Sequence, residues 1–212
     1  MKIKLCGIRR REDIAFLNIY KPDYAGFVFA GTKRRVTPEQ AAVLSGGLSP
    51  EIKRVGVFVN ETAAGVESAV KTAGLSAVQL HGDENPEYIS GLKKLLPSTE
   101  VWKAVKVNGR KSIESALKTD ADMLLFDSYS EGGYGGTGKT ADIKLIKSMK
   151  ISRPFFIAGG ISAENISCIV NTLSPYGVDI SSGIETNGVK DGQKIKRIMG
   201  IISKINLEGQ AI

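Results

Sequence analysis

Short runs of apolar and β-branched residues recur eight times along the 212 residues of the chain. Their nearly continuous hydrophobicity is typical of parallel strands that are buried on both faces. The predicted strands are Ile3–Cys6, Tyr24–Phe29, Arg54–Val59, Ala77–Leu80, Val101–Val107, Met123–Asp127, Phe155–Ala158 and Gly177–Ile180.

Between these runs, apolar residues follow helical spacing. The i, i+3, i+4, i+7 pattern predicts a helix over residues 66–73 that ends at Gly74, and another over residues 166–173 with Ser162 as its N-cap. A helix over residues 89–96 is stopped by Pro97, and a last helix covers residues 195–202.

Eight strands that alternate with eight helical segments predict an α/β protein with a closed (β/α)8 TIM barrel. No linker or shift of composition interrupts the alternation, so we expect one catalytic domain over residues 1–212. A doubly wound open sheet is the alternative, because periodicity does not exclude it. A barrel would place the chemistry at the carboxyl ends of its strands.

Composition narrows the class of protein. Lys and Arg total 29 against 22 Asp and Glu, and the resulting charge of +7 is spread along the chain, which suits a small anionic ligand at least as well as nucleic acid. Two cysteines cannot form a disulfide framework, and one histidine gives no His-based zinc centre. No apolar run approaches the roughly 20 residues of a membrane span, and the first residues lack a secretory signal. We therefore expect a cytoplasmic protein.

Reactive and small residues collect at the predicted strand ends. In chain order they are Cys6 with Gly7, the basic loop Lys33–Arg35, Gln79 with His81, Asp127, Gly159 with Gly160, and Asp179 with Ser181, Ser182 and Gly183. Each of these residues also has a purely structural interpretation, since cysteines often pack in the core and runs of charged residues often lie at the solvated surface. Cys168 lies among the apolar residues of a helix, and there the packing interpretation is preferred. The shared location at one rim favours function for the others.

Two small-residue loops suggest a phosphate site. Glycine lets backbone N–H groups approach an anion closely. Gly159–Gly160 and Ser181–Gly183 follow the seventh and eighth strands, where phosphate-binding barrels hold their phosphate. Residues 133–140 match the GxxxxGK[ST] pattern of nucleotide-binding proteins, but they do not follow their strand directly, so we set that interpretation aside.

Seven segments resemble the phosphoribosylanthranilate isomerase family of tryptophan biosynthesis. They are LCGIRRREDI, GFVFAGTKRRVTPEQA, RVGVFVN, VQLHGDE, LLFDSYSEGGYGGTGKTADI, IAGGI and VDISSGIE, and they run in the family's order from residue 5 to residue 185. The second loop reads GTKRRVTP where many members have SPRYV or SKRYI, so Arg34 is aligned with the family's substrate arginine and Arg35 is the alternative.

The resemblance implies an Amadori rearrangement of a phosphoribosyl anthranilate without a cofactor or a metal. It assigns the base to Cys6 and the acid to Asp127, and the substrate contacts to Arg34, Gln79, His81 and Asp179. The phosphate would be held around Gly136, Gly159, Gly160, Ser181, Ser182 and Gly183. The implied partner is this small molecule rather than nucleic acid or a membrane, and the chain would act as a monomer or homodimer.

Both catalytic assignments require shifted pKa values. An ordinary thiol of pKa about 8.5 is roughly 3% thiolate at pH 7, and an ordinary aspartate of pKa about 3.9 is protonated about once in a thousand. We therefore expect cations such as Arg34 to stabilise the Cys6 thiolate. We also expect the apolar residues before Asp127 to raise its pKa.

Rival functions fit the residues less well. A ribulose-phosphate epimerase would need several histidines and acids as metal ligands, and an indole-glycerol-phosphate synthase would need lysine and glutamate where Cys6 and Gln79 stand. A nucleic-acid-binding module would show aromatic residues interleaved with basic ones, a pattern that is missing from this sequence.

Overall fold

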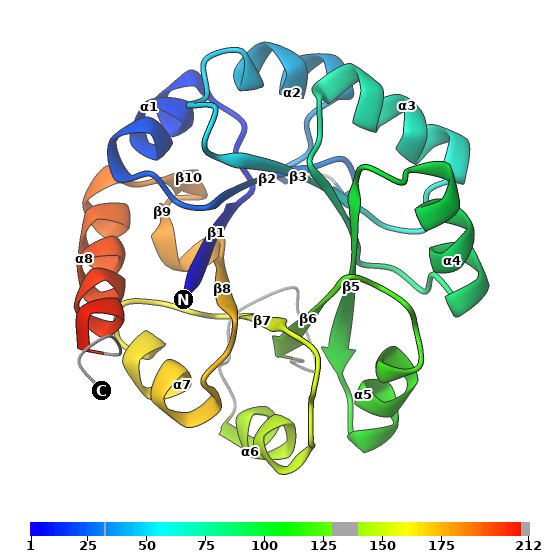
Figure 1. Cartoon of the computed structure of the whole chain (residues 1–212). Helices are drawn as coiled ribbons and strands as arrows, with labels where there is room; N and C mark the ends of the chain where they lie inside the picture. Colours follow the sequence, from blue (N-terminus) through cyan, green and yellow to red (C-terminus); the bar gives the residue numbers. More distant parts are fainter. Residues whose placement is uncertain (32, 129–139, 209–212) are drawn as a thin grey trace.

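The eight predicted strands form a closed parallel barrel in the computed structural model, which describes residues 1–31, 33–128 and 140–208. Each strand pairs with the next in the chain, and β8 pairs with β1 to close the ring (Figure 1). The closed barrel is confirmed, and the alternative of an open doubly wound sheet is wrong. The strands are β1 (Lys2–Cys6), β2 (Tyr24–Val28), β3 (Lys53–Phe58), β4 (Ala77–Leu80), β5 (Glu100–Val107), β6 (Met123–Ser128), β7 (Phe155–Ala158) and β8 (Gly177–Ile180).

Helices surround the barrel as an outer ring (Figure 1). They are α1 (Arg11–Tyr20), α2 (Pro38–Ser45), α3 (Ala63–Ala73), α4 (Pro86–Leu95), α5 (Arg110–Leu117), α6 (Thr140–Ser148), α7 (Ile166–Leu173) and α8 (Gly192–Glu208). None of the helices in the described part of the chain combines the length and the apolarity that a membrane crossing needs.

Local chemistry fixes the helix ends, with one departure from the sequence prediction. Helix α3 begins after Thr62, whose side chain accepts from the N–H of Gly65, and it ends at Gly74 in the left-handed region with φ 60°. The prediction that Ser162 caps the seventh helix is wrong. Helix α7 starts later, after Asn165, and the Ser162 hydroxyl instead accepts from the Glu164 N–H in the preceding turn.

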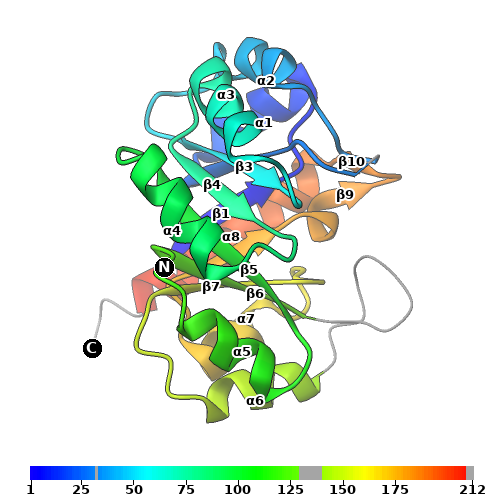
Figure 2. The same ribbon diagram turned by 90° about the vertical axis from the view of Figure 1, so that its right-hand side faces the viewer.

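A small structure that the periodicity did not predict follows β8. It consists of the 3-10 turn η1 (Ser182–Ile184) and the antiparallel hairpin of β9 (Glu185–Thr186) and β10 (Val189–Lys190). Figure 2 shows the hairpin beyond the end toward which the barrel strands point. It therefore lies at the end of the barrel where the sequence predicts the chemistry.

The strand residues divide between two cores because successive side chains point to opposite faces of a strand. One set packs outward against the helices and includes Leu5, Val78, Leu80, Phe126 and Val178. The other fills the barrel interior with a separate apolar cluster, which we call the inner apolar cluster: Tyr24, Val55, Ala77, Trp102, Ala104, Met123, Leu125, Phe156 and Ala158. Trp102 is fully buried and its ring is stacked on Phe156, with the ring centroids 5.0 Å apart. The interior is therefore a packed core, with no open channel through this cluster.

Candidate active site at the carboxyl ends of the strands

The same alternation places polar side chains on the interior face, between the inner apolar cluster and the carboxyl ends of the strands, and one of them is Lys106 on β5, in register with Asp127. The other five are Lys4 and Cys6 on β1, Gln79 on β4, Asp127 on β6 and Asp179 on β8. On each of these strands the neighbouring apolar residues point outward to the helices. We call these five residues the polar interior group.

Cys6 is the last residue of β1 and is 8% exposed. It lies opposite Gly26 of β2, where a Cβ atom would come within 2.7 Å of the Cys6 sulfur, so glycine leaves the room that the thiol occupies. Burial raises the pKa of the thiol, Lys4 and Lys190 lower it and Asp179 raises it, and the net direction is upward. Cations lower this pKa, as expected, but the principal ones are Lys4 and Lys190 rather than Arg34, and desolvation outweighs them.

Two ion pairs lie next to this thiol. The Lys4 ammonium is 2.9 Å from Asp179 Oδ2, and Lys4 is fully buried. The Lys190 ammonium is 2.7 Å from Glu185 Oε1 and 3.1 Å from the carbonyl oxygen of Ser181. Sequence reasoning missed Lys4, Glu185 and Lys190. The signal for Lys4 was its position two residues before Cys6, which puts both on one face of a strand.

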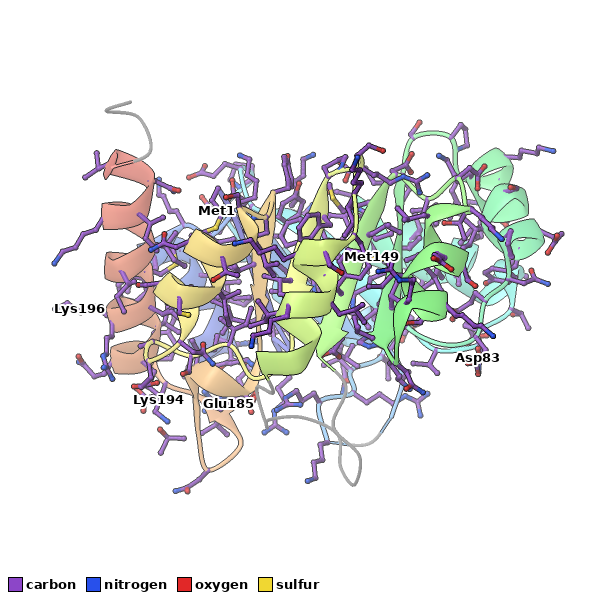
Figure 3. All side chains as sticks on the ribbon, turned by 90° about the horizontal axis from the view of Figure 1, so that it is seen from below. Met1, Asp83, Met149, Glu185, Lys194 and Lys196 are labelled. Carbon is purple, nitrogen blue, oxygen red and sulfur yellow. The ribbon has the colours of Figure 1, made fainter. Side chains whose placement is uncertain are left out.

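Arg34 joins the second of these pairs. Its Nε and Nη2 atoms donate to Glu185 at 2.8 and 2.6 Å, a bidentate geometry that holds the guanidinium in one orientation. Burial alone would raise the pKa of Glu185, but the hydrogen bonds from Arg34 and Lys190 outweigh it and hold that pKa at about 2. Figure 3 places Glu185 at the end of the barrel opposite Met1.

Arg34 also lies close to the end of β1. A Cβ atom at Gly7 would come within 2.6 Å of Arg34 Cδ, so the arginine stem passes directly over the residue that follows Cys6. Arg35 is exposed, and no side-chain hydrogen bond or ion pair joins it to another described residue. These positions favour Arg34 over Arg35 as the arginine that faces the site.

A hydrogen-bonded chain connects β4 to β6. Gln79 Nε2 lies 3.2 Å from His81 Nδ1, and His81 Nε2 lies 3.3 Å from Asp127 Oδ2. An amide nitrogen only donates, so with this pairing Nδ1 accepts and the ring hydrogen lies on Nε2, toward Asp127. The expectation of an apolar surround for Asp127 is wrong in part: its side chain is 30% exposed and faces an imidazole.

The loop after β4 is held by a buried ion pair. Lys103 donates to Glu84 Oε2 at 2.8 Å and to the Gly82 carbonyl oxygen at 2.6 Å, and the Gly82 N–H donates back to Glu84. The Glu84 side chain is 2% exposed. This arrangement fixes the backbone immediately after His81, and a groove of about 480 Å³ runs from His81 past Lys103 toward α5.

The two predicted phosphate loops touch each other. Gly159 and Gly160 adopt φ values of 86° and 61°, which favour glycine. A Cβ atom at Gly183 would run into the Ile161 carbonyl oxygen, so the loops after β7 and β8 meet at this glycine. Ser181 Oγ donates to the Cys6 carbonyl oxygen at 3.1 Å, which ties the second loop to β1. Gly136 and nearly all of residues 133–140 lie outside the described residues.

Over residues 1–31, 33–128 and 140–208, no group of three or more His, Cys, Asp and Glu side chains is arranged to hold a metal ion. The charges at the mouth of the barrel are instead paired by hydrogen bonds. The chemistry that these side chains offer is proton transfer, by a thiol and a carboxyl group, near a guanidinium that can bind a carboxylate.

The closed barrel and these side chains define the chain as a (β/α)8-barrel protein with acid–base groups at the carboxyl ends of its strands. A family model described as N-(5'phosphoribosyl)anthranilate (PRA) isomerase matches residues 3–200. A relative from Acetivibrio thermocellus, named N-(5'-phosphoribosyl)anthranilate isomerase, is 47% identical over 200 residues, covering 92% of each chain. The chain belongs to this isomerase family.

Solved structures agree with that assignment. The crystal structure of phosphoribosyl anthranilate isomerase from Thermotoga maritima matches with a TM-score of 0.84 and 36% identity, covering 94% of this chain and 97% of that one. A structure of the isomerase in complex with reduced 1-(o-carboxyphenylamino)-1-deoxyribulose 5-phosphate matches with a TM-score of 0.78 and 31% identity, over 94% and 96% of the two chains.

Proposed function

We propose that this chain catalyses the phosphoribosylanthranilate isomerase step of tryptophan biosynthesis, with Asp127 as general acid and Cys6 as general base. The reaction converts N-(5-phospho-β-D-ribosyl)anthranilate to 1-(2-carboxyphenylamino)-1-deoxy-D-ribulose 5-phosphate. One observation carries the residue assignment: Cys6 and Asp127 both point to the barrel interior at the carboxyl ends of their strands, β1 and β6. Only β7 and β8 lie between these two strands on one side of the barrel. A sugar bound in the mouth of the barrel can then lie between them.

The first step opens the ribose ring, and it needs a proton at the ring oxygen. Asp127 supplies it in this proposal. The 3.3 Å contact with His81 Nε2 occupies Oδ2 and leaves Oδ1 for the sugar. Gln79 supports this orientation because its amide N–H is bonded to the other ring nitrogen of His81. Ring opening gives a Schiff base between the ribose C1 and the anthranilate nitrogen.

The second step removes the proton from C2 to give an enolamine, which tautomerises to the ketone. The Cys6 thiolate takes this proton. Because burial raises the pKa of the thiol, the thiolate is scarce at neutral pH but is a correspondingly stronger base when formed. A base that transfers one proton per turnover needs only a fraction of its population in the active form.

Charge and loop geometry support the binding roles. Arg34 binds the anthranilate carboxylate, through guanidinium hydrogens that Glu185 does not use. The loops at Gly159–Gly160 and Ser181–Gly183, with Gly136, hold the phosphate through their backbone N–H groups. Asp179 lines the sugar site, since its Oδ1 is buried and has no hydrogen-bond partner among the described residues.

The proposal is tested by generating phosphoribosylanthranilate in situ and following the loss of its anthranilate-type fluorescence on addition of the protein. Saturable, enzyme-dependent loss supports the function. Loss at the uncatalysed rate at every protein concentration contradicts it. We also propose that the protein is cytoplasmic, forms a single catalytic domain, and acts on this small molecule as a monomer or homodimer without binding nucleic acid. Size-exclusion chromatography tests the oligomeric state, and a salt-dependent filter-binding assay tests for nucleic-acid binding.

A further inference from the structure

A fully buried lysine shares the interior face of β1 with the Cys6 thiol. Lys4 precedes Cys6 by two residues and is 0% exposed. Lysine is almost never fully buried unless it is paired, because desolvation of an ammonium costs several kcal/mol. Its ammonium lies 2.9 Å from Asp179 Oδ2, and its side chain points to the same face of β1 as the Cys6 thiol. The steps proposed above give this residue no role.

The charges around the thiol do not balance while Cys6 is protonated. Four charged groups face the thiol: Lys4 from β1, Asp179 from β8, Lys190 from β10 and Arg34 from the loop after β2. Glu185 joins the cluster because its carboxylate binds both Arg34 and Lys190. Three of these are cations and two are carboxylates. Among the described residues the cluster therefore carries one excess positive charge, which is cancelled when the Cys6 thiol loses its proton.

Lys4 is the cation best placed to act on that proton. Arg34 binds both oxygens of Glu185 and Lys190 binds its Oε1, so this carboxylate lowers the net field of both cations at the sulfur. Lys4 binds only one oxygen of Asp179 and is removed from water, so its field is weakly screened. Burial raises the pKa of Cys6, and Lys4 is the largest influence that opposes this rise.

We infer that Lys4 is a positioning residue for the reaction: its buried ammonium stabilises the Cys6 thiolate that takes the C2 proton. The inference rests on the role of Cys6 in the proposed function. Lys4 acts through the thiol and does not itself reach the sugar, because none of its surface is exposed.

The decisive experiment titrates the thiol in Lys4→Met. Iodoacetamide alkylation is measured against pH, and peptide mass spectrometry resolves Cys6 from Cys168. The prediction that Cys168 packs in the core is wrong, since it is exposed on α7, and it serves as an internal reference. The Cys6 profile should move upward by about one pH unit or more, so that alkylation at neutral pH slows by about tenfold or more. The Cys168 profile should stay unchanged.

The matched control is Lys2→Met, on the same strand two residues earlier. The Lys2 side chain is 47% exposed and pairs with Asp23 rather than with the thiol. Its removal should leave the Cys6 profile unchanged. A folded Lys4→Met protein, by circular dichroism, with an unshifted Cys6 profile overturns the inference.

A second variant should shift the Cys6 alkylation profile in the opposite direction. Asp179→Asn removes an anion that raises the pKa of Cys6 and leaves the Lys4 ammonium with the thiolate as its natural counterion. The Cys6 profile should then move to lower pH. A shift to higher pH, or none, overturns the inference even if Lys4→Met does not fold.

The isomerase assay separates this inference from the proposed function. In Lys4→Met the ascending limb of kcat/KM against pH should move upward together with the alkylation profile, while KM changes less than kcat. A wild-type protein without isomerase activity overturns the proposed function. An active wild-type enzyme whose Cys6 titration ignores Lys4 overturns this inference alone.

Discussion

The two halves of the barrel interior, the inner apolar cluster and the polar interior group, share only strands β4 and β6, and they do different work. The inner apolar cluster packs Tyr24, Trp102 and Phe156 into edge-on and stacked contacts with ring centroids 5.0 to 5.7 Å apart. The polar interior group, nearer the carboxyl ends, holds charges that are mostly buried. Apolar burial stabilises a fold, whereas a buried ion pair at best offsets its own desolvation. The comparison teaches that stability resides in one half of the interior and reactivity in the other.

The largest effect is expected from the reactive half. Cys6→Ser and Asp127→Asn should each lower kcat by about 10²–10⁴-fold, because each removes one proton-transfer group. Binding of a product analogue and the midpoint of thermal unfolding should stay close to those of the wild type. Steady-state kinetics, isothermal titration calorimetry and thermal unfolding followed by circular dichroism measure these three quantities. Activity within tenfold of the wild type in either variant refutes the role of that residue.

Trp102→Ala tests the apolar half. Removal of this fully buried ring should lower the free energy of unfolding by about 3–5 kcal/mol, through lost burial and the cavity that remains. Urea unfolding followed by circular dichroism gives the value. Ile19→Ala, at a side chain that is 68% exposed on α1, is the control and should cost under about 0.5 kcal/mol. Equal losses of unfolding free energy in Trp102→Ala and Ile19→Ala would contradict the stabilising role of the inner apolar cluster.

Glu185→Gln tests whether the charges of the reactive half support one another. Loss of this carboxylate leaves Arg34 and Lys190 without their anion, and we expect about 1–3 kcal/mol of destabilisation at pH 7 and a raised KM. Glu164→Gln, in the exposed pair with Arg197, should change stability by less than about 1 kcal/mol.

The pH dependence of the same variant has a definite sign. The pKa of Glu185 is held at about 2, below its ordinary value of 4.5, so its contribution to stability is complete above about pH 4.5 and is lost as pH falls toward 2. The difference in unfolding free energy between the wild type and Glu185→Gln should shrink over that interval in urea titrations. A constant difference from pH 7 to pH 3 contradicts the assignment.

The smallest effect is expected at the contact between the two loops. Gly183→Ala pushes a methyl group against the Ile161 carbonyl oxygen, so the loops after β7 and β8 must separate. We expect KM to rise by about tenfold, a change of about 1.4 kcal/mol in transition-state binding, with a smaller change in kcat. Gly91→Ala on α4 adds its methyl group in open space and should leave KM unchanged. A KM for Gly183→Ala equal to that of the control argues against phosphate binding by these loops.

Sequence patterns predicted the strands well because parallel strands buried on both faces form nearly continuous apolar runs, whose side chains still alternate between the two faces. They predicted β4, β7 and β8 at the residues where these strands begin and end. The same alternation could have revealed Lys4 as an interior residue, but its partner Asp179 is 175 residues away, and only the closed barrel brings the two together. The hairpin of β9 and β10 was missed because strands of two residues show no periodicity.

The direction of the thiol pKa could not be predicted for a related reason. The sequence shows that cations are close to Cys6 in the chain, yet the outcome depends on how far burial outweighs them. That balance is set by packing from β2, where Gly26 lets the backbone approach the sulfur, and by ion pairs that close around it. Arg34, which the sequence suggested as the stabilising cation, is instead held by Glu185.

The account depends most on the thiol and the carboxyl group acting on one sugar. A crystal structure of this protein with reduced 1-(o-carboxyphenylamino)-1-deoxyribulose 5-phosphate, the ligand in the related complex, tests this directly. We expect the Cys6 sulfur about 3–3.5 Å from C2 of the sugar and the Asp127 carboxylate within hydrogen-bonding distance of the oxygen on C4. A ribulose chain bound beyond the reach of either group would contradict the account.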